Sequence, residues 1–183
     1  MSSHTPQHTD LSCACGKMQL QLEGAPILSA ECLCTSCRTA GAQLQALQLA
    51  RPMLEPNAGT RFVLYRKDRV RFSAGRQNLK EHRLTPRSQT RRVIATCCNT
   101  PIFLELERGH WLSLYANLWP EQTRPAIEMR TMVSDLSDAS ALTHDVPNAK
   151  RQPLSFFTRL IGAWIAMGFK VPKLELGREA IRV

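Results

Sequence analysis

The sequence lacks the apolar runs that would carry it into or across a membrane. No run approaches the ~18 apolar residues that a bilayer-spanning helix needs, so we expect no transmembrane segment. The first ten residues, MSSHTPQHTD, are polar and contain no apolar core of a secretory signal. We therefore interpret residues 1–10 as a disordered tail and expect a cytoplasmic protein.

Histidines at metal-ligand spacing are also lacking. His4 and His8 lie in the N-terminal tail, and His82, His110 and His144 are far from one another in the sequence. We interpret each as a solvated or structural histidine. The cysteine count is seven, which is odd, and clustered thiols in a reducing compartment indicate metal binding or catalysis rather than disulfides.

All the cysteines that are present fall in three short clusters, and this is the strongest signal in the sequence. C-x-C spacing puts two sulfurs on one face of a strand, and C-x-x-C lets two sulfurs reach one ion from a tight turn. Scattered cysteines would instead be typical of small core hydrophobes. We therefore predict that zinc is bound by thiolates from these seven residues: Cys13, Cys15, Cys32, Cys34, Cys37, Cys97 and Cys98.

Strand-like segments fill most of the chain before residue 133. KMQLQLEG at 17–24, TRFVLYR at 60–66 and PIFLELE at 101–107 are rich in alternating, β-branched or aromatic residues, and Gly or Pro residues separate such segments. LQALQLA at 44–50 is ambiguous between strand and helix. The pattern predicts a mainly β domain, which we place at residues 11–133.

The C-terminal part of the chain has a different character. A polar linker is predicted at 134–152, a helix at 153–170 and a tail at 171–183, because the apolar sequence PLSFFTRLIGAWIAMGFK begins with proline and ends near Gly168. A helix this apolar is usually buried against its own domain or against a partner subunit, as in a homodimer. Docking on a membrane surface is a third alternative, which its few basic residues disfavour.

Positive charge is concentrated in one segment. Between Arg51 and Arg92 there are twelve basic and three acidic residues, an excess of nine that equals the net charge of the whole chain. Such a segment attracts anions, among them nucleic acid and small carboxylates. Phe62, Tyr65 and Phe72 interleave with its arginines, as in stacking sites for single-stranded nucleic acid, although alternating aromatics in a strand are more often its buried face.

The motifs CACG, CLCTSCR and TCCNTP together resemble the glutathione-dependent formaldehyde-activating enzyme family, which also includes centromere protein V-like domains. The family pattern runs C-x-C-G, then C-x-C-x-x-C-[RQ], then C-x-x-C-G-T-P, and the resemblance covers roughly residues 11 to 120. It implies a β-tent fold of small antiparallel sheets gathered around zinc. It also implies one structural zinc shared by the first and last clusters, and a second zinc in the middle cluster with a position open for a substrate thiol.

Carried over residue by residue, the resemblance implies an open, catalytic zinc site at Cys32, Cys34 and Cys37. Arg38, the next residue, is placed to balance the negative charge of three thiolates. The structural site would contain Cys13, Cys15 and Cys98.

Three positions depart from the family pattern. Ala95 stands where the last motif has its first cysteine, Asn99 replaces its glycine, and Leu33 stands where formaldehyde-activating members commonly have histidine. The form A-x-C-C-x-T-P is similar to that of a separate branch of the family. Because Ala95 cannot bind a metal, Cys97 is a candidate fourth ligand of the structural zinc, or else a partner of the three-cysteine site.

These observations support three functional hypotheses. The first is a zinc-dependent carbon–sulfur lyase that acts on the adduct of glutathione, or another small thiol, with a small aldehyde. The second is a non-catalytic zinc-stabilised module that binds an anionic partner through residues 51–92, with nucleic acid the less favoured partner. The third is a redox or metal-handling protein that uses the adjacent thiols of Cys97 and Cys98.

Overall fold

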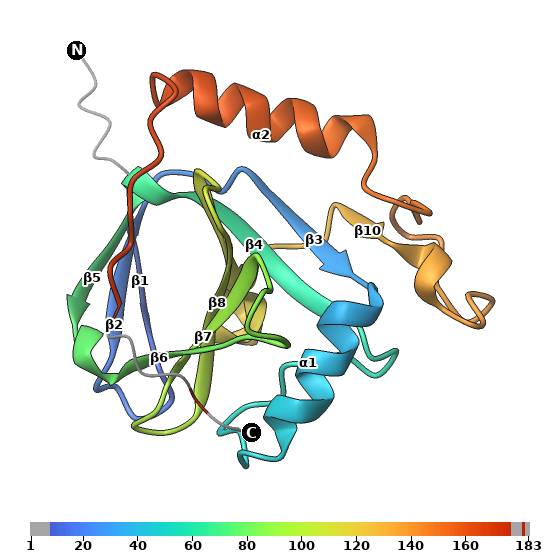
Figure 1. Cartoon of the computed structure of the whole chain (residues 1–183). Coiled ribbons are helices and arrows are strands. Elements are labelled where there is room, and N and C mark those ends of the chain that lie inside the picture. Colours follow the sequence, from blue (N-terminus) through green and yellow to red (C-terminus); the bar gives the residue numbers. More distant parts are fainter. Residues whose placement is uncertain (1–7, 177–180, 182–183) are drawn as a thin grey trace.

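The computed structural model describes residues 8–176 and residue 181, and within them the fold is mainly β, as predicted. The strands form a three-stranded sheet in the order β1-β2-β5 and a seven-stranded sheet in the order β10-β3-β4-β9-β8-β7-β6 (Figure 1). All pairings are antiparallel except that of β10 with β3. The strands are β1 His8–Ser12, β2 Gln19–Glu23, β3 Leu28–Cys32, β4 Thr60–Arg66, β5 Val70–Ala74, β6 Leu79–His82, β7 Thr90–Ala95, β8 Thr100–Leu106, β9 Trp111–Tyr115 and β10 Met129–Thr131.

Two α-helices accompany the sheets within residues 8–176. They are α1, Thr35–Gln45, which follows β3 directly, and α2, Leu154–Ala166, which is the predicted C-terminal apolar helix. In Figure 1, α2 crosses the top of the molecule above β3 and β4. No helix among the described residues is long and apolar enough to cross a membrane. Short 3-10 helices lie at Lys67–Arg69, Arg76–Asn78, Ala116–Leu118, Glu121–Thr123 and Val133–Asp135.

The large sheet separates two hydrophobic clusters, because its strand β4 is apolar on both faces. Val63 and Tyr65 of β4 pack with Leu20 and Leu22 of the small sheet. Phe62 and Leu64, which point to the opposite face as alternation along a strand requires, pack in the second cluster with Leu160 of α2. This second face of the large sheet carries the candidate catalytic site.

The N-terminus differs from the sequence-based prediction. The composition predicts a disordered tail at residues 1–10, but residues 8–10 form the first part of β1 and pair with β2 from His8↔Glu23 onward. The backbone of this polar segment is held by hydrogen bonds to its neighbour, which composition alone does not reveal. The rest of that tail, residues 1–7, lies outside the described residues.

The second difference is α1, which the sequence did not predict as a helix. Cys34 is its N-cap, and the Cys34 Sγ accepts a hydrogen bond from the backbone N–H of Cys37. Residues 44–50, whose sequence is ambiguous between strand and helix, contain only the last two residues of this helix, Leu44 and Gln45. Gly41 suits its packing face, because a Cβ there would meet the Leu54 side chain, which would have to shift.

The polar segment at 134–152 and the C-terminal segment are both attached to the sheets. The backbone of Arg130 in β10 bonds to Pro147 and Ala149, each at 2.9 Å. Farther along, Leu174 and Leu176 pack against the first hydrophobic cluster. Of the predicted tail at 171–183, residues 177–180 and 182–183 lie outside the described residues.

Candidate metal centres

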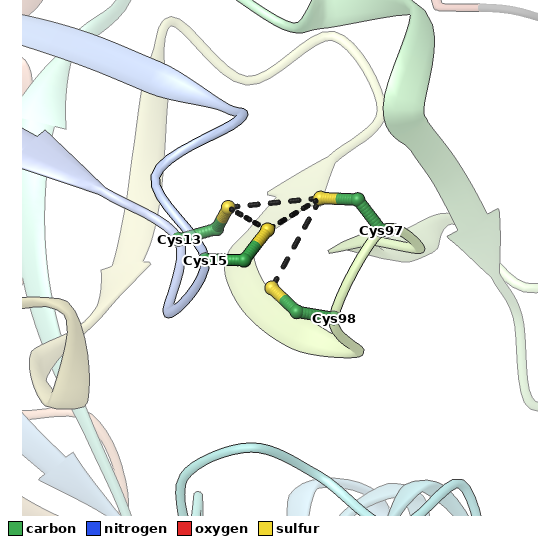
Figure 2. Close-up of side chains that lie close together, drawn as sticks. All are labelled: Cys13, Cys15, Cys97 and Cys98. Carbon is green, nitrogen blue, oxygen red and sulfur yellow. Dashed lines mark hydrogen bonds between the residues drawn. The ribbon is translucent and has the colours of Figure 1, made fainter.

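The first and last cysteine clusters of the sequence come together in space. Cys13 and Cys15 lie in the turn between β1 and β2, while Cys97 and Cys98 lie in the turn between β7 and β8 (Figure 2). All four sulfurs lie within 4.8 Å of one another. Two pairs of cysteines that are at least 82 positions apart in sequence thus form one four-thiol cluster. We call it the tetrad: Cys13, Cys15, Cys97 and Cys98.

Both turns have backbone conformations that suit their sequences. Gly16 has φ 76°, a left-handed conformation that glycine adopts without strain, and its N–H bonds to the Cys13 carbonyl at 3.0 Å. Asn99 has φ 52°, so asparagine fills the left-handed position where the family pattern has glycine. Its side-chain amide donates to the carbonyl oxygen of Leu47, which fixes the turn.

The spacing of the tetrad sulfurs fits a tetrahedral zinc ion. Zinc–sulfur bonds of about 2.3 Å at tetrahedral angles require sulfurs about 3.8 Å apart. The Sγ distances are 3.6 Å for Cys13–Cys15, 3.7 Å for Cys13–Cys97, 3.4 Å for Cys15–Cys97 and 4.0 Å for Cys97–Cys98. The donor set therefore fits a closed, four-cysteine site.

Hydrogen bonds around the tetrad favour a thiolate at Cys98, whereas burial raises the pKa of Cys13 and of Cys97. The backbone N–H of Met18 donates to Cys13 Sγ at 3.3 Å, and the Thr100 hydroxyl lies 3.0 Å from Cys98 Sγ. Burial would raise the pKa of Cys98, but this contact with Thr100, together with bonds from Cys15 and Cys13, lowers it to about 6. Donors of this kind orient and stabilise metal ligands.

The middle cluster forms a second site, which we call the triplet: Cys32, Cys34 and Cys37. Its sulfurs also lie within 4.8 Å of one another. Cys32 ends β3, Cys34 caps α1 and Cys37 lies in the first turn of that helix, so the strand-to-helix connection itself makes the sulfurs converge. With three thiols the triplet leaves room for a fourth ligand, whereas the tetrad is complete.

Arg92 is the buried cation beside the triplet, a position for which the sequence predicts Arg38 instead. Arg92 lies in β7 and is only 1% exposed. Its Nη2 donates to the carbonyl and hydroxyl oxygens of Ser36, at 3.1 and 3.0 Å. Hydrogen bonds from Cys32 and Cys37, helped by the charge of Arg92, lower the pKa of Cys34 to about 3 although burial opposes this.

Arg38, the cation expected beside the triplet, bonds elsewhere in the structure. Its Nη1 donates to the carbonyl oxygen of Asp135 at 3.1 Å. Its contribution to the charge balance of the triplet stays a prediction. Strand alternation could have indicated that one of the adjacent Arg91 and Arg92 points inward, but not which one.

A pocket of about 510 Å³ opens beside the triplet. Arg92 and the three cysteines lie in its lining, and α2 forms one wall. The rest of the lining is mostly apolar and comes from both the large sheet and the helix, including Phe62, Leu64, Leu104, Phe156, Leu160 and Ile161.

The basic segment at 51–92 is spread over many elements, and several of its cations form ion pairs. Lys67 forms a buried ion pair with Glu105, and Arg91 bonds to both Glu105 and Glu81. Two of the aromatic residues that interleave with its arginines, Phe62 and Tyr65, are buried in the two hydrophobic clusters. Their rings are therefore not available to stack on a nucleic acid.

The two buried histidines, His82 and His110, both contact neighbouring residues of the fold. His110 is buried, with its Nε2 2.8 Å from the Leu160 carbonyl oxygen and its ring stacked on Trp164 of α2 at 5.7 Å. The buried His82 lies 3.2 Å from the Gln43 side-chain oxygen. His4 lies outside the described residues.

Comparison with known proteins gives one family match. A family model described as glutathione-dependent formaldehyde-activating enzyme matches residues 8–131. No curated protein matches the sequence. Among solved structures, the crystal structure of a Rhodobacter sphaeroides protein aligns with a TM-score of 0.45 and 11% identity, over 65% of this chain and 97% of that one.

Proposed function

The chain belongs to the glutathione-dependent formaldehyde-activating enzyme family, and on that basis we propose that it is a zinc-dependent carbon–sulfur lyase. Its substrate would be the adduct of a small thiol, such as glutathione, with an aldehyde. The observation that carries the proposal is the difference between the two cysteine sites. The tetrad supplies four thiols, while the triplet supplies three thiols and faces a pocket.

In this proposal the two sites have different roles. Cys13, Cys15, Cys97 and Cys98 would hold a structural zinc, which joins the β1–β2 turn to the β7–β8 turn. Cys32, Cys34 and Cys37 would hold the catalytic zinc. When bound there, zinc supplies Lewis acidity and lowers the pKa of a thiol that it binds.

The reaction itself is a reversible addition. In one direction a C–S bond forms between the thiol sulfur and the aldehyde carbon, and the thiol proton is transferred to the carbonyl oxygen. In the other direction the C–S bond breaks and the proton returns to sulfur. Arg92 would orient the reacting oxygen or sulfur by donating a hydrogen bond from Nη1, which faces no protein acceptor among the described residues.

Chemical exchange measured by NMR tests the proposal. Zinc-loaded protein should accelerate exchange between free and aldehyde-bound glutathione above the uncatalysed rate. Cys34→Ser should abolish the acceleration while the tetrad still holds one zinc per chain, which shows that the variant is folded. If the wild type does not accelerate exchange with any thiol and aldehyde, the lyase proposal is wrong, and a zinc-stabilised binding module becomes the better account.

A further inference from the structure

The pocket beside the triplet is poorly matched to the peptide part of glutathione. That peptide carries two carboxylates and an ammonium group, which need several charged or polar partners. Arg92 is the one charged side chain in the described lining of this pocket, and it bonds to Ser36 between the cysteines of the triplet. The exposed lining is mostly apolar, although uncharged polar side chains also line the pocket, among them Ser36, Thr90, Ser113, Thr131 and Gln152. The apolar part of the lining is what a hydrocarbon group requires.

The pocket has a buried cation beside the triplet, and most of its other lining is apolar. Arg92 is 1% exposed and its Nη1 has no hydrogen-bond partner among the described residues. An orphaned buried donor of this kind is costly unless a ligand or water supplies an acceptor. In the apolar lining, Phe62 and Leu64 of the sheet face Phe156, Leu160 and Ile161 of α2.

We infer that this pocket binds a medium-length apolar chain whose acceptor head group reaches Arg92 and the triplet. The inference rests on the proposed function and deepens it, because the chain would be the substituent of the aldehyde. The preferred aldehyde is then an alkyl or aryl aldehyde rather than formaldehyde. The peptide part of the thiol would lie outside the pocket.

The volume and construction of the pocket agree with such a ligand. A volume of about 510 Å³ is in the usual range for small-molecule sites. Formaldehyde has no group that would occupy the space between the sheet and α2. Each methylene moved from water to this space should strengthen binding about fourfold, since burial of a CH₂ group is worth about 0.8 kcal/mol.

A series of carboxylates tests the inference without depending on lyase chemistry. Butanoate, hexanoate and octanoate offer an unreactive acceptor head with chains of increasing length, and calorimetry on the zinc-loaded protein measures their affinity. We expect an increase on the order of a hundredfold from butanoate to octanoate. Equal affinities across the series would overturn the inference.

Two variants locate the chain and the head. Ser113→Leu puts a larger side chain into the pocket wall. It should lower the affinity for octanoate at least tenfold and change the affinity for butanoate little. Ser140→Leu, at an exposed position, is its control. Arg92→Lys should weaken all three carboxylates by a similar factor, with exposed Arg87→Lys as control. If Ser113→Leu binds octanoate as tightly as the wild type does, the chain lies elsewhere and the inference is wrong.

Glutathione binding separates this inference from the proposed function. Because the glutathione thiol and the octanoate head group would both reach the triplet, glutathione should displace octanoate in either case. The inference is wrong if Ser113→Leu weakens glutathione binding as strongly as octanoate binding, because the pocket then holds the thiol peptide. If octanoate binds as expected but no aldehyde exchanges faster than in buffer, the lyase proposal fails while the apolar pocket stands.

Discussion

The sulfurs of Cys15 and Cys97 lie 3.4 Å apart, although 82 positions separate the two residues in sequence. Ala95, which stands where the family pattern has a cysteine, is fully buried in β7 and belongs to the first hydrophobic cluster. Cys97 supplies the fourth thiol of the tetrad, where Ala95 offers no ligand atom. The adjacent Cys98 reaches the same cluster because the chain turns between β7 and β8, where Asn99 has a positive φ.

Replacement of Cys97 tests its role as the fourth ligand of the tetrad. We expect Cys97→Ser to lose one zinc per chain and to lower the melting temperature strongly, because the tetrad joins two turns that are distant in sequence. Native mass spectrometry gives the zinc count and calorimetry gives the stability. Cys37→Ser is the matched control, since it should lose the zinc of the triplet and keep that of the tetrad. A Cys97→Ser protein with unchanged zinc content would remove Cys97 from the site.

The sequence predicted the cysteine clusters and the mainly β domain because both depend on local spacing. It did not predict α1, whose sequence TSCRTAGAQLQ includes Gly41 and two threonines and has few apolar residues. Its helical form depends on the Cys34 cap and on tertiary packing. The burial of Arg92 rather than Arg91 could not be predicted either, because it depends on Glu105 from the neighbouring strand accepting a bond from Arg91.

The buried charge of Arg92 should strengthen metal binding at the triplet. Three thiolates and one Zn²⁺ carry a net negative charge, which a nearby cation stabilises. Arg92→Met should therefore lower the zinc affinity of the triplet roughly tenfold or more, as the loss of a supporting group usually does. Competition with a chromogenic chelator measures this, and Arg87→Met at an exposed position is the control. Equal affinities in the two variants would show that Arg92 does not support the metal.

Glu105 is the second charged residue whose replacement should be costly. It bonds to both Lys67 and Arg91, and the side chains of Lys67 and Glu105 are 5% and 7% exposed. Glu105→Gln leaves Lys67 buried without its partner charge, so we expect a loss of about 3–5 kcal/mol in the free energy of unfolding. Asp68→Asn breaks the more exposed Arg66–Asp68 pair and should cost at most about 1 kcal/mol. Urea denaturation of both variants checks the difference, and similar losses would contradict it.

Leu160 should hold α2 against the sheet. It is 5% exposed, and its carbonyl oxygen bonds to His110, whereas Ile165 on the same helix is 55% exposed. Leu160→Ser should release α2 from the sheet, and hydrogen exchange along the helix should then be faster. Where the release of α2 is coupled to unfolding, the free energy of unfolding should fall by about 2–4 kcal/mol. Ile165→Ser should change stability by no more than about 0.5 kcal/mol. Unchanged exchange in Leu160→Ser would show that other contacts hold the helix.

The two buried histidines should make the protein less stable as the pH falls. Burial lowers the pKa of His110; the charge of Lys67 acts in the same direction, and the hydrogen bond to Leu160 opposes it. Burial and the charge of Arg92 lower the pKa of His82. Below about pH 6.5, where a free histidine begins to bind a proton, the unfolded chain binds more protons than the folded one, so the free energy of unfolding decreases. We expect this decrease to begin near pH 6.5 and to continue to the lower pKa of the folded protein. His110→Gln, which keeps a donor for Leu160, should reduce the slope relative to wild type, and His144→Gln, at an exposed position, is the control for the substitution itself. Urea denaturation between pH 8 and 5.5, over the range where zinc content stays constant, measures the slopes; equal slopes in wild type and His110→Gln would exclude His110 as a source of the effect.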